Sequence, residues 1–494
     1  MTTSGCERDE PYDLAVIGAG CAGIAGAVAA SELGLTVALV DDSPQTGGQF
    51  YRHPAPALGA VRPEALHHDW SAFRDLDRRL AAGDVTRLAG HHVWSLTRSD
   101  AAPGGLWTVH AVTGSDGTEE APATVRARAV LLATGAYERQ LPFPGWTVPG
   151  VVGAGGAQAM LKSGLVLPGR RIVVAGSGPL LLAVASSLAA AGARVPTVVE
   201  ASGYLRYARS PRALATSPRK AVEALRHGGA LLRHGVRLRT RSAVTEVHGA
   251  DRVEGVTVSR LDRDWRPVRG SGRLIACDAL AVGHGLVPQI ELATALGCAT
   301  RRLPDATLAL ALDGLQETSV RGLWAAGEPA GVGGAELART EGELAGIAVA
   351  ARLRGRGAPG GRVRELRRRR DRMRAFADVM TAAHAPGPGW SRWMTDETEV
   401  CRCEEVTAGG VREAVADLGA RDARTVKLFT RAGMGWCQGR MCGTAVACLA
   451  ASGGAAATPE APAPVASASE PPAERRPLAV PVPLSALASL DEES

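Results

Sequence analysis

Four cysteines near the C-terminus form two close pairs with a spacing that suits a metal centre. One residue separates Cys401 from Cys403, and four residues separate Cys437 from Cys442. Four thiolates that are brought together as two such pairs can hold a [2Fe–2S] cluster. Zinc is the alternative, but its structural sites usually have two to four residues between paired cysteines, so the C-x-C pair is atypical of zinc. The spacing therefore favours iron–sulfur over zinc.

Positive charges around these cysteines favour the same metal centre. A helix predicted over residues 443–451 begins directly after Cys442, and the positive end of its dipole would stabilise a thiolate and a negatively charged cluster. Arg402, Lys427 and Arg440 would act in the same direction. The sequence has nine cysteines, an odd number, and four of them lie close together. This usage favours a metal site in a reducing cytoplasm over a disulfide framework.

A glycine-rich turn near the N-terminus has the residue types that bind a dinucleotide. Gly18, Gly20 and Gly23 follow an apolar run that predicts a buried strand, and Asp41 ends the next such run. In this G-x-G-x-x-G pattern the first glycine permits the tight turn, the second lets the backbone approach a pyrophosphate, and the third lets helix and strand pack closely. The pyrophosphate then lies at the helix N-terminus. Asp41 is predicted to accept hydrogen bonds from the adenosine ribose.

Three further loops each follow a predicted strand. Together they indicate that the dinucleotide is FAD. The first is interpreted as backbone packed against a flavin, with an ordinary turn as the alternative. The second ends a strand in A-T-G, a signature of FAD proteins that carry two dinucleotide-binding domains. The third supplies a carboxylate for the hydroxyls of the ribityl chain, before a helix N-terminus that can face the flavin. The residues of these loops are Gly47, Gly48 and Gln49, then Thr134 and Gly135, then Gly327 and Glu328.

A second strand–helix–strand unit carries an incomplete version of the nucleotide pattern. Gly176 and Gly178 follow a predicted strand, and Glu200 ends the next one. Leu181 stands where the third glycine would be, and it should hold the helix further from the strand. The unit is interpreted either as a site for a second adenine nucleotide, NAD or ATP, with Glu200 on its ribose, or as a retained scaffold.

The length and net charge of the chain limit the number of domains and the kinds of partner that it can have. The 494 residues suffice for two or three domains, and the formal net charge of +6 is too evenly spread to indicate nucleic-acid binding. No uninterrupted apolar run reaches 18 residues, so a soluble protein without a transmembrane segment is predicted. A basic segment up to residue 374 has apolar residues at helical spacing, which predicts a packed helix with solvated arginines. The Ala/Pro/Ser/Glu-rich tail is predicted to be disordered, because it cannot offset the entropy of ordering.

Together these residues resemble a family of subunits that contain FAD and an iron–sulfur cluster. The family includes the alpha subunits of bacterial amino-acid and hydroxyproline dehydrogenases, the opine oxidases and the middle subunit of hydrogen cyanide synthase. The cysteine region is similar to the bacterioferritin-associated ferredoxin (BFD) type, which supports [2Fe–2S]. The segments that carry the resemblance are ATGAYER (133–139), PFPGW (142–146), GGAQ (155–158), CRCEEVT (401–407) and TRAGM (430–434).

The resemblance implies an α/β fold of the glutathione-reductase type, with two Rossmann-like dinucleotide-binding domains and a small helical [2Fe–2S] domain. In that arrangement the second nucleotide-binding domain interrupts the FAD-binding domain. The implied parts are a discontinuous FAD-binding domain (10–150 and 286–352), a second nucleotide-binding domain (151–285), a basic helical linker (353–395), a BFD-like domain (396–452) and a disordered tail (453–494).

The resemblance also implies an oxidoreductase that acts on C–N bonds within a multi-subunit complex. A small amine, amino acid or opine is the implied substrate, and a glycine-oxidase-like flavoprotein beta subunit is the implied partner. The partner would oxidise the amine while this chain relays electrons; the competing expectation is oxidation at this chain's own FAD. A stand-alone NAD(P)H-dependent flavin reductase and a non-enzymatic electron-transfer or docking module are the alternatives.

Two features restrict the chemistry at the flavin. No C-x-x-C or C-x4-C pair occurs before residue 401, which argues against thiol–disulfide exchange. Tyr137, Glu138 and His384 are candidate general bases, but a structural role is the favoured interpretation of each, so the catalytic group stays unassigned.

Overall fold

The computed structural model describes residues 10–67, 69–99, 105–114, 120–204, 207, 218–355, 360–451 and 478–488. Within them, the largest sheet has the strand order β3-β2-β1-β6-β5-β4, and β19 also pairs with β6. Its parallel part is β3-β2-β1-β6-β19, and β4 and β5 are antiparallel to their neighbours. The strands are β1 (Tyr12–Ile17), β2 (Val37–Asp41), β3 (Val85–Ala89), β4 (His91–Ser99), β5 (Leu106–Thr113), β6 (Ala121–Leu132) and β19 (Leu323–Ala325).

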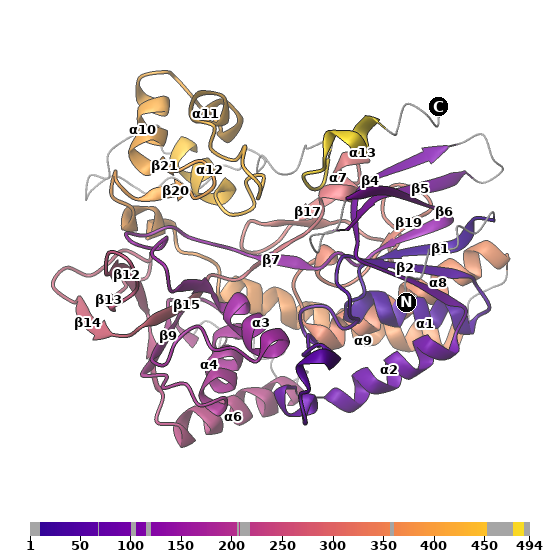
Figure 1. Cartoon of the computed structure of the whole chain (residues 1–494), viewed down its shortest axis with the longest axis horizontal. Helices are drawn as coiled ribbons and strands as arrows, with labels where there is room; N and C mark the ends of the chain where they lie inside the picture. Colours follow the sequence, from indigo (N-terminus) through magenta and orange to yellow (C-terminus); the bar gives the residue numbers. More distant parts are fainter. Residues whose placement is uncertain are drawn as a thin grey trace.

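The parallel strands are apolar because both of their faces are covered. One face packs against α1 (Cys21–Glu32), which lies beside α8 (Ala335–Arg354), as Figure 1 shows. The carboxyl ends of parallel strands meet at one edge of a sheet. The loops that follow β1, β2, β6 and β19 therefore lie at the same edge, although they are spread over three hundred residues of sequence.

A second sheet, fully parallel, has the order β11-β10-β9-β15-β8. Helices α3, α4 and α6 lie along it (Figure 1). The short strands β7 (Ala136–Glu138) and β16 (Leu286–Pro288) pair antiparallel between the two sheets and carry the chain into and out of this part. The other elements are β8 (Val151–Gly153), α3 (Ala154–Gly164), β9 (Ile172–Gly176), α4 (Leu180–Ala190), β10 (Thr197–Glu200), α6 (Pro218–Arg233), β11 (Arg237–Thr240) and β15 (Ala279–Gly283).

The C-terminal helices pack against a three-stranded antiparallel sheet of the second part. Val244 and Trp265 share one continuous apolar core with Val411 and Val446. Thr407 and Asp422 begin α10 and α11 as N-caps, each accepting a backbone N–H. The elements are β12 (Ser242–His248), β13 (Gly255–Arg260), β14 (Arg273–Ala276), β20 (Glu399–Cys401), β21 (Val406–Thr407), α10 (Ala408–Ala416), α11 (Ala423–Thr430) and α12 (Gly443–Ala451).

Helix α9 (Gly360–Ala383) corrects one expectation. Its arginines were expected to be solvated, but the side chains of Arg370 and Arg374 are each only 15% exposed. Arg370 donates to Gln316 Oε1 (3.0 Å), and Arg374 pairs with the buried Glu341 of α8. The expectation is wrong at these positions because α9 lies against α8 and the loops beside it, so that the guanidinium groups find internal acceptors.

The predicted disorder of the tail is also wrong for residues 478–488. They include the short helix α13 (Leu484–Ala488), and Val480 and Ala486 pack with Trp94 and Val112 of the first sheet. Apolar side chains at these positions supply the contacts that the rest of the tail composition lacks. Residues 453–477 and 489–494 lie outside the described residues.

The remaining elements connect these parts. None of the described helices is both long enough and apolar enough to cross a lipid bilayer. The connecting elements are η1 (Pro56–Leu58), η2 (Pro63–Leu66), α2 (Trp70–Ala82), α7 (Glu291–Ala295), β17 (Thr300–Arg302), β18 (Leu308–Leu310), η4 (Glu328–Ala330) and η5 (Pro388–Trp393).

Candidate cofactor site

The turn between β1 and α1 has the geometry that a pyrophosphate requires. Gly18 has φ of 104°, and a Cβ there would lie 2.4 Å from the carbonyl oxygen of Ala133. A Cβ on Gly23 would lie 1.8 Å from the carbonyl oxygen of Gly18. Gly20 is the N-cap of α1, and no side chain caps this helix end. The N–H groups of the first turn therefore stay available to an anion.

Asp41 lies at the end of β2, beside this turn. Its carboxylate accepts hydrogen bonds from the backbone N–H groups of Ala19 and of Ser43 (2.8 Å). Burial raises the pKa of Asp41 to about 6. Asp41 also lines a small cavity together with Pro44 and Arg87. Asp41 is predicted to accept hydrogen bonds from the adenosine ribose, and the ribose would have to enter this cavity to reach it.

The predicted flavin loops converge on the same turn. Gly47 N–H donates to the carbonyl oxygen of Ala19 (2.8 Å), and a Cβ on Gly48 would lie 2.8 Å from Gly20 Cα. Gln49 follows as an exposed residue. The loop is thus held against the start of α1, where the interpretation as flavin-contacting backbone places it.

The A-T-G strand end is tied to the segment that returns from the second sheet. Thr134 Oγ1 donates to the carbonyl oxygen of Gln289 (2.6 Å), and the N–H of Gln289 donates to the carbonyl oxygen of Gly135 (3.0 Å). These bonds place residues 286–291 beside the predicted flavin position.

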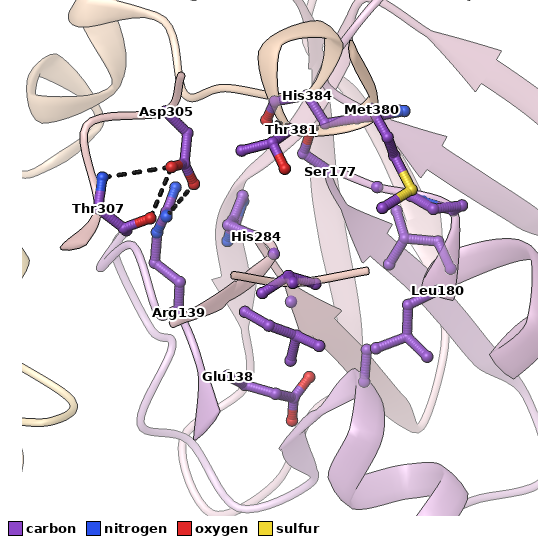
Figure 2. A pocket seen from close by; sticks show the side chains of 18 of the residues that line it. Glu138, Arg139, Ser177, Leu180, His284, Asp305, Thr307, Met380, Thr381 and His384 are labelled. Atoms are coloured by element: carbon purple, nitrogen blue, oxygen red, sulfur yellow. Dashed lines mark hydrogen bonds and ion pairs between the residues drawn. The ribbon is translucent and has the colours of Figure 1, made fainter. Parts of the chain in front are cut away.

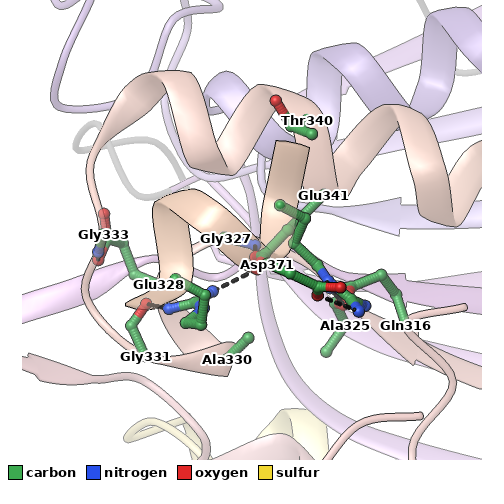
Figure 3. Close-up of polar contacts among 12 residues, drawn as sticks. Gln316, Ala325, Gly327, Glu328, Ala330, Gly331, Gly333, Thr340, Glu341 and Asp371 are labelled. Atoms are coloured by element: carbon green, nitrogen blue, oxygen red, sulfur yellow. Dashed lines mark hydrogen bonds and ion pairs between the residues drawn. The ribbon is translucent and has the colours of Figure 1, made fainter. Parts of the chain in front are cut away.

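Gly327 and Glu328 complete the edge of the sheet (Figure 3). Gly327 N–H donates to Glu341 Oε2 (2.9 Å), and the Glu328 carboxylate accepts the N–H groups of Gly333 and Gly334, each at 3.1 Å. Burial raises the pKa of Glu328. In this structure the carboxylate therefore bonds the backbone before α8, and contact with a ribityl chain remains a prediction.

The second nucleotide unit is covered by its own chain. Glu200 is fully buried, and its carboxylate accepts the N–H groups of Gly178 (3.0 Å) and Ser202 (2.9 Å). His384, directly after α9, lies over it: His384 Nδ1 is 3.5 Å from Glu200 Oε1, and Nε2 is 2.9 Å from the Tyr207 hydroxyl oxygen. The group predicted to hold a ribose is thus occupied by internal partners.

The turn itself is formed as the sequence predicted. Gly176 ends β9, and a Cβ there would lie 1.7 Å from the carbonyl oxygen of Gly283. Leu181, on α4, is buried in the core that α3 and α4 form with the second sheet. Ser177 Oγ, in the turn, donates to the carbonyl oxygen of His384 (3.1 Å). This bond adds a second contact between the turn and the end of α9.

A cavity of about 100 Å³ lies in front of this turn (Figure 2). Arg139 and Asp305 form a buried ion pair on one side of it (2.5 Å). Glu138, on the other side, accepts N–H groups from Gly155 (2.8 Å) at the start of α3, and burial raises its pKa. Burial lowers the pKa of His284 to about 3, so its imidazole is neutral. The sequence pattern signalled Glu138 but not Arg139, Asp305 or His284.

The four predicted cluster cysteines come together between β20 and α12. Cys401 and Cys442 are buried, Cys437 is partly buried and Cys403 is exposed. A hydrogen bond from the Cys442 thiol lowers the pKa of Cys401 to about 6 and that of Cys437 to about 5. Cys401 Sγ also accepts the N–H of Gly433 (3.5 Å). Donation of hydrogen bonds to Cys401 and Cys437 raises the pKa of Cys442, and burial raises that of Cys403. Two of the four thiols, Cys401 and Cys437, are therefore shifted towards the thiolate form that binds iron.

The four thiols are linked to one another by hydrogen bonds. Contacts between sulfur atoms run from Cys401 to Cys442, then to Cys437 and then to Cys403. Among the described residues, no group of three or more His, Cys, Asp or Glu side chains is placed to hold a single metal ion. A two-iron cluster distributes four sulfur ligands over two metals, whereas zinc needs all four around one point. The C-x-C spacing of Cys401 and Cys403, rather than these contacts, favours the two-iron cluster.

Arg440 connects the cysteine loop to the first part of the molecule, a contact that sequence reasoning missed. Its Nε lies 3.0 Å from Glu291 Oε1 at the start of α7, and the two side chains are 15% and 5% exposed. Glu291 follows Gln289, which bonds the A-T-G strand end. Arg440 was noted in the sequence only as a positive charge near the cysteines, because its partner lies 149 residues away.

Comparison with known proteins identifies the two kinds of domain that carry these sites. The family model for pyridine nucleotide-disulphide oxidoreductases matches residues 12–351, more than half of the chain. The chain belongs to this family. A second model, the BFD-like [2Fe-2S] binding domain, matches residues 399–451, which include all four cluster cysteines. The protein is therefore an FAD-dependent oxidoreductase with a [2Fe–2S] domain, as the glycine and cysteine patterns predicted.

Curated relatives and a solved structure extend this assignment. The hydrogen cyanide synthase subunit HcnB of Pseudomonas aeruginosa is 34% identical over 86% of this chain and 90% of its own length. An opine oxidase subunit from Agrobacterium tumefaciens is 35% identical over 88% and 84%. L-proline dehydrogenase from P. horikoshii has the same fold, with a TM-score of 0.60 over 88% of this chain and 73% of that chain, at 22% identity. Both curated relatives are named as subunits of larger enzymes.

Proposed function

We propose that this chain is the electron-relaying alpha subunit of a multi-subunit enzyme that oxidises the C–N bond of an amino acid or an opine. One observation carries the proposal: Arg440, between two cluster cysteines, pairs with Glu291 on the segment held against the predicted flavin site. This contact fixes the cluster loop to the flavin side of the molecule. When bound, FAD accepts electrons in pairs and the cluster passes them on singly.

Two of the three candidate bases, Glu138 and His384, support a relay over amine oxidation at this chain's own FAD. Glu138 accepts N–H groups at the start of α3, and His384 bonds Tyr207 while it lies against Glu200. Both side chains are thus engaged in holding elements together. A partner subunit would then remove the proton and electrons from the amine.

The names of the relatives indicate the substrate class and the partner. Both are subunits, one of an opine oxidase and one of hydrogen cyanide synthase. We assign this chain a small amine, amino-acid or opine substrate, handled with a glycine-oxidase-like flavoprotein beta subunit, and a quinone or another carrier as acceptor. The cysteine ligands must remain reduced until a cluster is assembled, which suits the cytoplasm.

Anaerobic mixing of the purified chain with a panel of substrates tests the proposal. The panel holds D- and L-amino acids, hydroxyproline and opines, and flavin absorbance is followed with and without the co-expressed partner subunit. The relay predicts that the flavin bleaches only when the partner is present. Bleaching within seconds by any panel member acting on this chain alone would contradict it.

The same anaerobic assay with NADH, NADPH and a reduced ferredoxin in place of the panel decides between the proposal and its alternatives. Rapid bleaching by NADH or NADPH would identify a stand-alone flavin reductase, an outcome that the covered Glu200 disfavours. Flavin reduction by a ferredoxin but by no metabolite, with or without the partner, would identify a non-enzymatic electron-transfer module.

A further inference from the structure

Lys162 is a buried cation next to the predicted flavin loop. It lies on α3 and is 6% exposed. Its ammonium donates to the backbone carbonyl oxygen of Phe50 (2.8 Å) and lies 5.6 Å from the centre of the Phe50 ring. The bond joins the second part of the molecule to the loop after β2.

No acidic side chain among the described residues neutralises this ammonium. Its hydrogen-bond partner is a neutral carbonyl, and of the ionisable groups only the Cys21 thiol favours its charged form. Burial lowers the pKa of Lys162 to about 8. A buried charge without a counter-charge is costly, so proteins retain one where a ligand or a function requires it.

The surroundings of Lys162 identify where a counter-charge would lie. Phe50 follows Gly48, whose Cβ would lie 2.8 Å from Gly20 Cα at the start of α1. Cys21 is the first residue of α1, and its thiol is close enough for Lys162 to act on its ionisation. The ammonium thus lies near the start of α1, whose first N–H groups no side chain caps.

We propose that Lys162 is the counter-cation of an anionic group of bound FAD. FAD offers two such groups: the pyrophosphate, and the isoalloxazine ring once reduction has given it negative charge. Attraction to the pyrophosphate would act equally on oxidised and reduced FAD. Attraction to the ring would act on the reduced form alone and would raise the reduction potential of the flavin.

Two substitutions at Lys162 test the proposal. Lys162→Met keeps the length of the side chain and removes its charge, whereas Lys162→Arg keeps the charge. Arg126→Met, on the exposed side of β6, removes one positive charge from the surface as a control. The measurements are the dissociation constant of oxidised FAD and the midpoint potential of the bound flavin.

Lys162→Met should either raise the dissociation constant of oxidised FAD at least tenfold or lower the midpoint potential by at least about 30 mV, whereas Lys162→Arg and Arg126→Met should change neither quantity by as much. A weaker FAD complex with unchanged potential assigns the charge to the pyrophosphate. A lower potential, by about 30 mV for each factor of ten in a two-electron couple, assigns it to the ring. If Lys162→Met changes neither quantity, the proposal is wrong.

A measurement on the unaltered protein guards against a variant that does not fold. The sequence has three lysines, at 162, 220 and 427, so the side-chain resonances of 13C-labelled lysine are readily assigned. The proposal predicts that the pKa of Lys162 is at least one unit higher with FAD bound than after FAD removal. An unchanged or lower pKa in the complex would overturn it. Neither experiment depends on a substrate or on the beta partner.

Discussion

Cys403 differs from the other three cluster cysteines because its side chain is exposed. Cys401 and Cys442 are buried in the core that joins the cluster domain to the second sheet. Replacing either of them would alter packing as well as ligation. Substitution at Cys403 therefore separates the loss of a ligand from the loss of the fold.

Cys403→Ser should abolish the [2Fe–2S] cluster while FAD remains bound. Three thiolates cannot complete the ligand set of two irons. Cys403 lies on the loop between β20 and β21, whereas the predicted FAD contacts lie at the carboxyl ends of the strands of the first sheet. Iron and sulfide analysis, flavin absorbance and the spin-resonance signal of the reduced protein measure the result. Cys448→Ser on α12 is the matched control and should retain the cluster. An intact cluster in Cys403→Ser would remove Cys403 from the ligand set.

The raised pKa of the Asp41 carboxyl group predicts that FAD binding depends on pH. Its pKa is raised to about 6 by burial, so the carboxylate loses its charge as the pH falls through 6. A protonated carboxyl has less capacity to accept hydrogen bonds from ribose hydroxyls. FAD affinity should therefore be constant above about pH 6 and fall below it, up to tenfold for each pH unit. Ultrafiltration and flavin fluorescence measure this, and Asp41→Asn should bind weakly with no such pH dependence.

At the scale of elements, the sequence predicted the strands and the chemistry at their ends. Gly18 and Asp41 were placed correctly because each follows an apolar run whose neighbours are local in sequence. The same reasoning predicted the helix over 443–451, which is α12. Contacts between distant elements could not be predicted in this way. Lys162 meets Phe50 across 112 residues, and His384 meets Ser177 across 207.

The end of α9 determines access to the second nucleotide unit. His384 and Tyr207 cover Glu200, whereas Asp41 in the first unit borders a cavity. Two copies of a similar strand–turn–helix unit therefore differ in whether the acidic side chain is accessible. That difference arises from α9, an element outside either unit, which is why the motif alone left both interpretations open.

His384→Ala should increase the affinity for ATP or NADH by about tenfold. Removal of the imidazole frees one side of the Glu200 carboxylate, and a factor of ten corresponds to about 1.4 kcal/mol, within the range of one hydrogen bond to a charged group. Isothermal titration calorimetry measures the change. The double variant His384→Ala/Glu200→Ala is the control and should lose the gain. Weaker nucleotide binding in His384→Ala would instead identify His384 as a nucleotide ligand.

At the scale of the whole molecule, the cluster domain is attached to both other parts. It shares an apolar core with the second sheet, and Trp146 Nε1 and Trp393 Nε1 donate to the carbonyl oxygens of Glu399 (2.7 Å) and Trp265 (2.9 Å). Its contacts with the flavin side include the Arg440–Glu291 ion pair and a hydrogen bond from Arg440 to the carbonyl oxygen of Ala479, which packs in the core of the first sheet. The apolar core therefore holds the domain, and the ion pair orients its cysteine loop.

Glu291→Gln should slow electron transfer between flavin and cluster at least tenfold without loss of either cofactor. The substitution leaves the Arg440 guanidinium in a buried position without a counter-charge, and breaking a buried pair in this way costs about 3–5 kcal/mol. The cysteine loop can avoid that cost by moving away from α7, while the apolar core keeps the domain attached. Light-driven reduction of the flavin, followed by the absorbance of the cluster, measures the transfer rate. Glu413→Gln, the same change at an exposed position on α10, is the control. Equal rates in the two variants would show that the pair does not position the cluster, and that the apolar core alone sets the distance between the centres.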